Sequence, residues 1–166
     1  MERTTTKSLS DLLLLGDPRL YEVCEPVLES EMHLIPGWVA DLHAVMEEIR
    51  AKYRFGRAIA APQIGVMKRL IYLNIDGPMV LVNPELRDLS HGMFEVWDDC
   101  MSFPNLLVRL ERHQSLRMSY LDEHWKRREM VAQGAISELL QHECDHLDGI
   151  LCTMRAKDEK SFKWRP

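Results

Sequence analysis

Two histidines four residues apart, His142 and His146, carry the strongest chemical signal in the sequence. In a helix they lie about one turn apart on one face, so both imidazoles can bind a single metal ion. Glu143 lies at the edge of that face, where it can take a proton from metal-bound water without being a ligand. The pattern indicates a metal-dependent hydrolase. A buried histidine pair that binds nothing is the weaker alternative, because it leaves the adjacent glutamate unexplained.

The residues around this motif predict the helix that the motif requires. Leu139, Leu140 and Leu147 fall with the two histidines on or near one stripe at helical spacing. Upstream, a glycine at position 134 bounds the segment. Downstream, the pair at 148–149 is aspartate and glycine, and glycine tolerates the left-handed conformation that ends helices.

The composition predicts one ordinary globular domain spanning residues 1–166. Hydrophobic residues make up 46% and charged residues 28% of the chain, which excludes a disordered class. A net charge of −5 argues against direct nucleic-acid binding, and no apolar run is long enough to cross a membrane. Residues 1–7 lack the order of a secretory signal, and four cysteines are too few for a disulfide framework. The expected location is the cytoplasm.

The hydrophobic pattern predicts an α+β fold in which antiparallel strands pack around the central helix that carries the HExxH motif. A first helix is expected over residues 38–53, after a proline and a glycine. A short charged tail should follow the histidine helix. The expected strands cover residues 69–75, 79–82, 107–112, 116–121 and 126–131, with turns at 76–78 and 122–124.

A catalytic metal normally takes three protein ligands, so the two histidines need a partner. Cys144 follows His142 by two residues and faces roughly the opposite side of the helix. Asp145 also points away and suits a supporting role beside the ligands. Cys152 and Cys100 remain as candidates, and spacing alone also allows Cys100 to be a buried core residue.

Cys152 would fit the spacing of one protease class, the metzincins, with cysteine in place of their third histidine. Those proteases need a methionine turn farther along the chain and a substrate cleft below the metal. Met154 follows Cys152 almost at once, and the sequence ends at Pro166. A thermolysin-like arrangement fails likewise, because the tail is too short to return a glutamate. A protease is therefore disfavoured.

Three sequence blocks resemble the peptide deformylase family, in the family's order. Residues 56–65 read GRAIAAPQIG and are similar to GxGxAAPQxG. Residues 98–102 read DDCMS and are similar to EGCLS, while residues 141–149 read QHECDHLDG and are similar to QHExDHLxG. The first and second blocks are altered. Further likeness at residues 16–20 and 81–86 extends the resemblance over nearly the whole chain.

The resemblance implies a metal site made by Cys100, His142 and His146, with Glu143 as general acid and base. Family members use one Fe²⁺ ion per chain naturally and accept zinc, nickel or cobalt. A thiolate with two imidazoles suits iron as well as zinc.

The resemblance also implies the reaction and the substrate. The family removes the formyl group from the amino-terminal formylmethionine of newly made polypeptides, so the expected partner is an N-formylated peptide, including nascent chains at the ribosome. The oxyanion that forms on the formyl group needs hydrogen-bond donors. In the family these are the side-chain amide at Gln63 and the backbone N–H at Met101.

Departures from the family pattern surround the expected metal site. Ala58 replaces a glycine where substrate backbone would run, and Asp99 replaces the glycine before the ligand cysteine. Glu138 lies one helical turn before His142, where the family typically has an apolar residue near its methionine pocket. Its carboxylate could be solvated or form a salt bridge with Arg57 or Arg112 at the pocket mouth, or it could change the preferred first side chain. The residues expected to bind substrate are Gly56, Arg57, Ala58, Ile59, Asp99 and Glu138.

The sequence is therefore consistent with three functional hypotheses. The favoured function is deformylation of formylmethionyl peptides. The second is a related amidohydrolase that acts on a different N-acyl or N-formyl group, because the pocket is altered while the metal machinery is complete. The third is a catalytically silent paralogue that only binds metal. Retention of both Glu143 and Gln63 argues against this third function, because a structural metal site needs neither residue.

Overall fold

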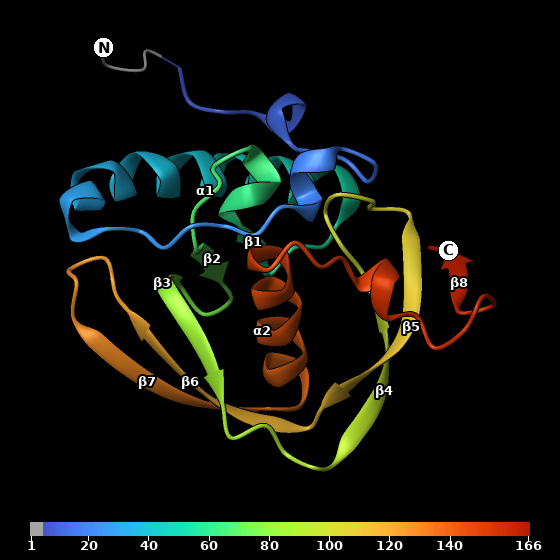
Figure 1. The fold of residues 1–166 in the computed structure, drawn as a ribbon. Coiled ribbons are helices and arrows are strands. Elements are labelled where there is room, and N and C mark those ends of the chain that lie inside the picture. The colour runs from blue at the N-terminus through green and yellow to red at the C-terminus, as the bar shows by residue number, and fades with distance from the viewer. Residues whose placement is uncertain (1–4) are drawn as a thin grey trace.

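The histidine pair lies on helix α2, Gly134–Leu147, which runs through the middle of the molecule (Figure 1). The computed structural model describes residues 5–166, so the first four residues of the expected non-secretory amino terminus lie outside the description. The other helices are α1 (Ile35–Tyr53) and the short 3₁₀ helices η1 (Leu9–Asp11), η2 (Pro18–Tyr21), η3 (Glu29–Leu34), η4 (Ala61–Ile64) and η5 (Cys152–Arg155). The strands are β1 (Ala58–Ala60), β2 (Leu70–Asn74), β3 (Pro78–Arg87), β4 (Met93–Asp98), β5 (Leu106–His113), β6 (Ser115–Leu121), β7 (Arg127–Gln133) and β8 (Phe162–Trp164).

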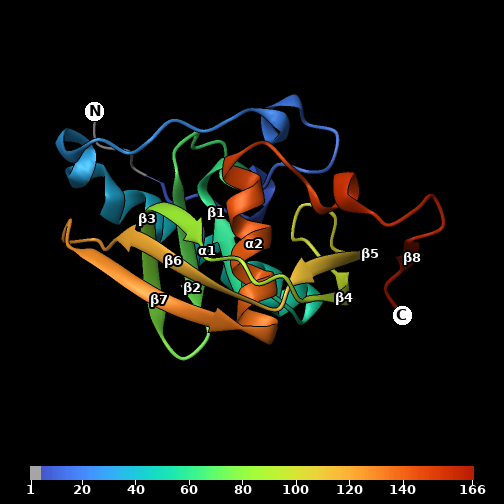
Figure 2. The same cartoon turned by 60° about the horizontal axis from the view of Figure 1, so that its bottom comes forward.

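The strands form two antiparallel sheets that enclose α2. One sheet has the order β1-β2-β3-β6-β7 and the other has the order β4-β5-β8. Figures 1 and 2 show α2 between the two sheets. The sequence-based prediction of an α+β fold with antiparallel strands around a central HExxH helix is therefore confirmed.

Helix α2 is buried on all sides from Ser137 onward, as expected for a helix covered by two sheets. Leu140, Cys144 and Leu147 recur at helical spacing and pack against the five-stranded sheet. The helix is followed by Gly149, whose φ of +71° is left-handed. A Cβ at this position would lie 2.5 Å from the backbone oxygen of Tyr21, so the turn requires glycine.

Helix α1 covers the opposite face of the five-stranded sheet. Leu42, Val45, Met46 and Ile49 form its buried stripe, which packs in one apolar cluster with residues of β1, β2 and β3. The helix begins at Ile35, three residues before the predicted start at position 38. The proline expected to precede the helix lies in its first turn instead, where its missing N–H costs no hydrogen bond.

The remaining differences from the sequence-based expectation concern short strands. The predicted strands are present with ends shifted by a few residues, and the second of them runs on to Arg87. Three strands were not predicted: β1, β4 and β8. Of these, β1 and β8 have three residues each, and all residues of β8 are exposed, so neither shows a usable alternation. The supposed charged tail thus contains a 3₁₀ helix and an edge strand that pairs with β5.

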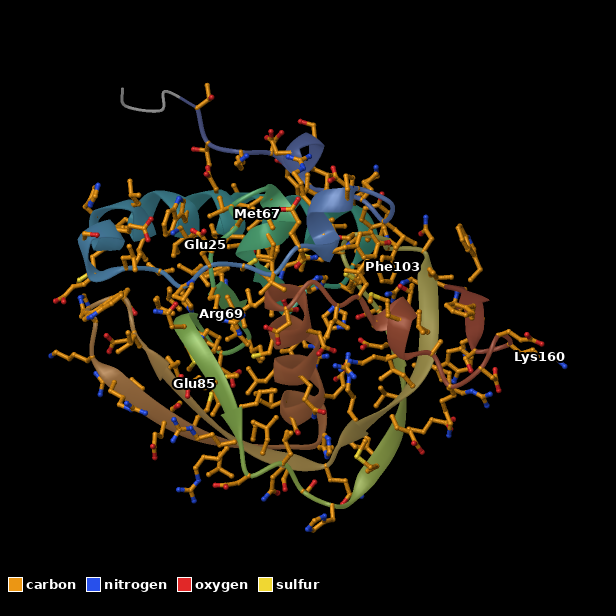
Figure 3. All side chains as sticks on the ribbon, viewed as in Figure 1. Glu25, Met67, Arg69, Glu85, Phe103 and Lys160 are labelled. Atoms are coloured by element: carbon orange, nitrogen blue, oxygen red, sulfur yellow. The ribbon has the colours of Figure 1, made fainter. Side chains whose placement is uncertain are left out.

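The segment before α1 is fixed to the start of β2. The backbone N–H of Glu25 donates to the oxygen of Met67, and the N–H of Arg69 donates to the oxygen of Glu25, at 3.2 and 2.9 Å. Figure 3 shows these three residues close together above β3. Neither long helix within residues 5–166 combines the length and the apolar character needed to cross a lipid bilayer.

Candidate metal centre and active site

Three buried side chains converge from α2 and from the loop after β4. The Nε2 atoms of His142 and His146 lie 3.2 Å apart, and Cys100 Sγ lies 3.4 Å from His146 Nε2. Tetrahedral zinc with ordinary bond lengths places two nitrogens about 3.3 Å apart and a nitrogen and a sulfur about 3.6 Å apart. These two distances match a single ion of this size, and the donor atoms of Cys100, His142 and His146 all lie within 4.8 Å of one another. This donor triangle could therefore hold one metal ion.

A carboxylate orients the first histidine. His142 Nδ1 donates to Asp98 Oδ2 at 2.9 Å, which leaves the Nε2 lone pair facing the triangle. Arg112 donates to the same carboxylate oxygen at 2.9 Å, and both side chains are almost fully buried. Burial opposes the charge of Asp98, but His142 and Arg112 outweigh it and hold the pKa of this carboxyl well below its usual range. Asp98 therefore remains an acceptor.

The surroundings of the second histidine favour its neutral form. Burial, reinforced by the neighbouring His142, lowers the pKa of His146 well below its ordinary value. Neutral imidazole is the form that binds metal ions. Its Nδ1 is buried and has no hydrogen-bond partner within residues 5–166, so the ring is positioned mainly by packing.

Glu143 has the properties of a proton carrier. Its side chain lines a cavity of about 200 Å³ next to the donor triangle, and its Oε2 atom is buried with no hydrogen-bond partner in the part of the chain that the structure describes. Burial raises the pKa of Glu143 to about 7. A carboxyl group that titrates near neutral pH can both accept and return a proton.

Gln63 brings a hydrogen-bond donor to the same place from η4. Its Oε1 accepts the backbone N–H of Ala60 at 2.9 Å, which fixes the orientation of the amide. Its Nε2 therefore points toward the metal site, where it donates to Ser102 Oγ at 3.1 Å and lies 3.6 Å from Cys100 Sγ. Met101, the other expected donor, also lines the cavity.

The remaining candidates from the sequence lie outside the triangle. Cys144 packs in the apolar cluster of the five-stranded sheet, and Asp145 makes ion pairs with Arg112 and Arg155 at 2.6 and 2.7 Å. Cys152 is buried close to the site: its Sγ, a carboxylate oxygen of Asp98 and a ring nitrogen of His142 lie within 4.8 Å of one another. Asp98 is already engaged by Arg112, which makes this second group a poorer metal site.

The cavity brings together most of the residues expected to bind substrate. Its wall includes Gly56, Arg57 and Ala58 from the β1 side, Asp99 from the cysteine loop and Glu138 from α2. Ala58 has strand backbone and its methyl group packs in the sheet core, so this position needs no left-handed glycine.

Ile59 is the exception among these residues. Its side chain is fully buried in the apolar cluster beneath α1 and is not part of the cavity wall. Only its backbone could contribute to binding.

Sequence reasoning missed the buried pair of Asp98 and Arg112. In the sequence, Asp98 stands in the DDCMS block without an assigned partner, and Arg112 was a candidate partner of Glu138 instead. Their pairing joins β4 and β5 below α2. A charged residue in the alternating apolar stretch 106–113 was a usable signal, because a buried arginine needs a buried carboxylate.

Substitution of Asp98 by asparagine should weaken metal binding. The amide cannot accept both hydrogen bonds as strongly as a carboxylate, so His142 loses orientation and basicity. Metal affinity should fall roughly 10- to 100-fold, the usual effect of losing such a partner. Chelator competition measures the change. Asp99→Asn is the control, because Asp99 pairs with Arg165 instead; equal affinities in the two variants would contradict the role of Asp98.

An HExxH helix enclosed by antiparallel strands, with a thiol completing the ligand triangle, defines the class as a metal-dependent hydrolase. The sequence profile of the polypeptide deformylase family matches residues 9–162. The chain belongs to this family. Peptide deformylase 2 of Ralstonia nicotianae is 33% identical over 162 residues, which covers 91% of this chain and 89% of that protein.

Solved structures show the same relationship. A peptide deformylase from Synechococcus elongatus in complex with actinonin is 29% identical, with a TM-score of 0.82 over 95% of this chain and 86% of that one. A Met-Ala-Ser-bound class I type b peptide deformylase from Acinetobacter baumannii is 28% identical, with a TM-score of 0.81 over 92% of this chain and 99% of that one. The likeness therefore extends over nearly the whole fold.

Proposed function

We propose that this chain, as one catalytic domain, removes the N-formyl group from the amino-terminal methionine of newly made polypeptides. The observation that carries the proposal is a carboxylate oxygen of Glu143 that has no hydrogen-bond partner within residues 5–166; Glu143 lines a cavity shared with Cys100 and with His142 on the same helix. A hydrolase needs such a group for each turnover, whereas a structural metal site does not.

Cys100, His142 and His146 would hold the metal ion. The donor set of one thiolate and two imidazoles suits Fe²⁺, and it also accepts Zn²⁺, Ni²⁺ or Co²⁺. When bound, such an ion supplies Lewis-acid chemistry, acidifying water and polarising a carbonyl group. Asp98 keeps the His142 ring in the tautomer that presents Nε2.

The protein groups around this site have two roles in hydrolysis: one carries a proton, and the others donate hydrogen bonds to the formyl oxygen. Glu143 accepts the proton of the attacking water and returns it to the departing amine nitrogen as the C–N bond breaks. Gln63 Nε2 and the backbone N–H of Met101 donate to the formyl oxygen as negative charge develops on it. The products are formate and a peptide with a free amino terminus.

Strand β1 is suited to hold the peptide backbone. In the described part of the chain it is the edge of its sheet, where it pairs with β2 alone. The N–H of Ala60 points away from β2 toward Gln63, so by the two-residue alternation Ala58 also directs its backbone groups to the open edge. An extended peptide can pair with Ala58 there. Gly56 makes room for the Met101 side chain, because a Cβ at this position would lie 2.7 Å from Met101 Cε.

The test is formate release from formyl-Met-Ala-Ser by protein loaded with Fe²⁺ under anaerobic conditions, because a ferrous thiolate site is sensitive to oxidation. Turnover supports the proposal. Inactivity on this peptide with activity on other N-acyl or N-formyl peptides would support the related amidohydrolase. Inactivity on every substrate at full metal occupancy would identify a silent paralogue.

The proposed partners are N-formylated nascent chains, met at the ribosome without direct binding to nucleic acid. The acidic net charge of −5 supports that last point. A cytoplasmic location is part of the same proposal, and it is supported by four unpaired cysteines, all buried.

A further inference from the structure

The cavity next to Glu143 is also lined by residues outside the metal site. At about 200 Å³ it is smaller than the roughly 300–1,000 Å³ of pockets for drug-sized ligands, so it suits a single side chain. With the reacting carbonyl beside Glu143 and Gln63, the neighbouring substituent of the substrate would meet the rest of the wall. Besides the residues at and next to the metal site, the wall includes Phe55, Gly56, Arg57, Met101, Glu138 and Leu139.

Two residues of the cavity wall form an ion pair. Arg57 Nη2 lies 3.2 Å from Glu138 Oε2, and Arg57 Nη1 donates to the backbone oxygen of Ala135 at 3.4 Å. The two partners differ in exposure to solvent. The Glu138 side chain is only 11% exposed and is fixed on α2, whereas the Arg57 side chain is 40% exposed and extends from the sheet edge.

The other acidic groups on the wall have other roles or partners. Glu143 is the proposed proton carrier, Asp98 is buried against Arg112, and Asp99 pairs with Arg165 at 2.6 Å. Glu138 is thus a buried carboxylate whose counterion can leave for solvent. An apolar side chain that displaces Arg57 would leave this carboxylate unpaired, which is unfavourable. A cationic side chain would replace Arg57 and keep the charge compensated.

We propose that Glu138 and Arg57 set the specificity of this pocket, so that the enzyme accepts N-formyl peptides whose first side chain ends in a cation as well as those that begin with methionine. The inference rests on the proposed function, because it assumes that the formyl group binds beside Glu143. In it, Glu138 receives the cationic end of the side chain, and Arg57 competes with substrate for the same carboxylate.

The test compares formyl-X-Ala-Ser peptides in which X is lysine, norleucine or methionine. Two variants that both break the ion pair should act in opposite directions. Glu138→Gln removes the acceptor and should lower the ratio of kcat/KM for lysine over norleucine by about 10- to 100-fold, the range for a lost hydrogen bond to a charged group. Arg57→Leu removes the competitor and should raise that ratio above the wild-type value.

A matched control and a second readout keep the outcome clear. Glu31→Gln breaks a different, partly buried ion pair, with Lys68 at 2.9 Å, and should leave the ratio unchanged. Calorimetric binding of the products Lys-Ala-Ser and norleucine-Ala-Ser should show the same opposite shifts, independently of turnover. If both variants move the ratio and the binding the same way, the pair is merely structural and the inference is overturned, even where formyl-Met-Ala-Ser is hydrolysed. Release of formate from none of the peptides would contradict the proposed function instead, and the binding shifts would still decide the pocket's preference.

Discussion

Replacement of Glu143 by alanine is expected to lower kcat for formate release by about 10²- to 10⁴-fold, the usual contribution of a positioned acid–base group. Metal content should stay at the wild-type level, because the carboxylate is not among the converging donors Cys100, His142 and His146. The variant should also fold normally, since it removes a buried oxygen that has no hydrogen-bond partner within residues 5–166. Loss of activity with full metal occupancy separates a proton carrier from a ligand.

The control for this prediction is another glutamate on an exposed turn. Glu123→Ala removes a carboxylate between β6 and β7 and should leave both kcat and metal content unchanged. Formate release and elemental analysis of the purified proteins measure the two quantities. If Glu143→Ala loses its metal, or keeps wild-type kcat, then Glu143 does not have the proposed role.

The sequence predicted the helices better than the strands, for a physical reason. Two sequence features predict helix α2: a stripe of leucines and histidines at helical spacing, and a glycine in the turn that follows the helix. By contrast, β1 has three residues, and its pairing with β2 depends on contacts between distant parts of the chain. Such a strand has too few side chains to show a period of two.

The same distinction holds for the candidate site. His142, Glu143 and His146 are close in sequence, so helix geometry alone relates them. Cys100 reaches them only through the fold, and spacing left it equal to Cys152 until the family resemblance was considered. The ion pair of Asp98 with Arg112 was not predicted, because residues 14 positions apart on two strands are joined only by tertiary structure. For Glu138 the sequence left Arg57 and Arg112 as candidate partners, and the structure pairs it with Arg57, 81 positions away.

The sharpest test of the ligand set compares the two cysteines next to the histidines. Cys100→Ser should remove or greatly weaken metal binding, because a neutral hydroxyl is a much poorer ligand than a thiolate. Cys152→Ser should keep the metal. Both thiols are buried, and both substitutions are equally small, so any general loss of stability should be similar. Metal affinity by chelator competition, with thermal unfolding of each metal-free protein, separates ligation from packing.

The geometry explains why Cys100→Ser should lose more metal affinity than Cys152→Ser. Cys100 Sγ lies 3.4 Å from His146 Nε2, close to the separation of a nitrogen and a sulfur on one tetrahedral ion. Cys152 groups instead with Asp98 and the ring of His142, whose Nδ1 already donates to that carboxylate. Burial also raises the pKa of Cys152 well above its usual value, which disfavours the thiolate that a metal requires. The reverse ranking, with metal lost from Cys152→Ser and kept by Cys100→Ser, would place the ion on the opposite side of His142 and refute the proposed centre.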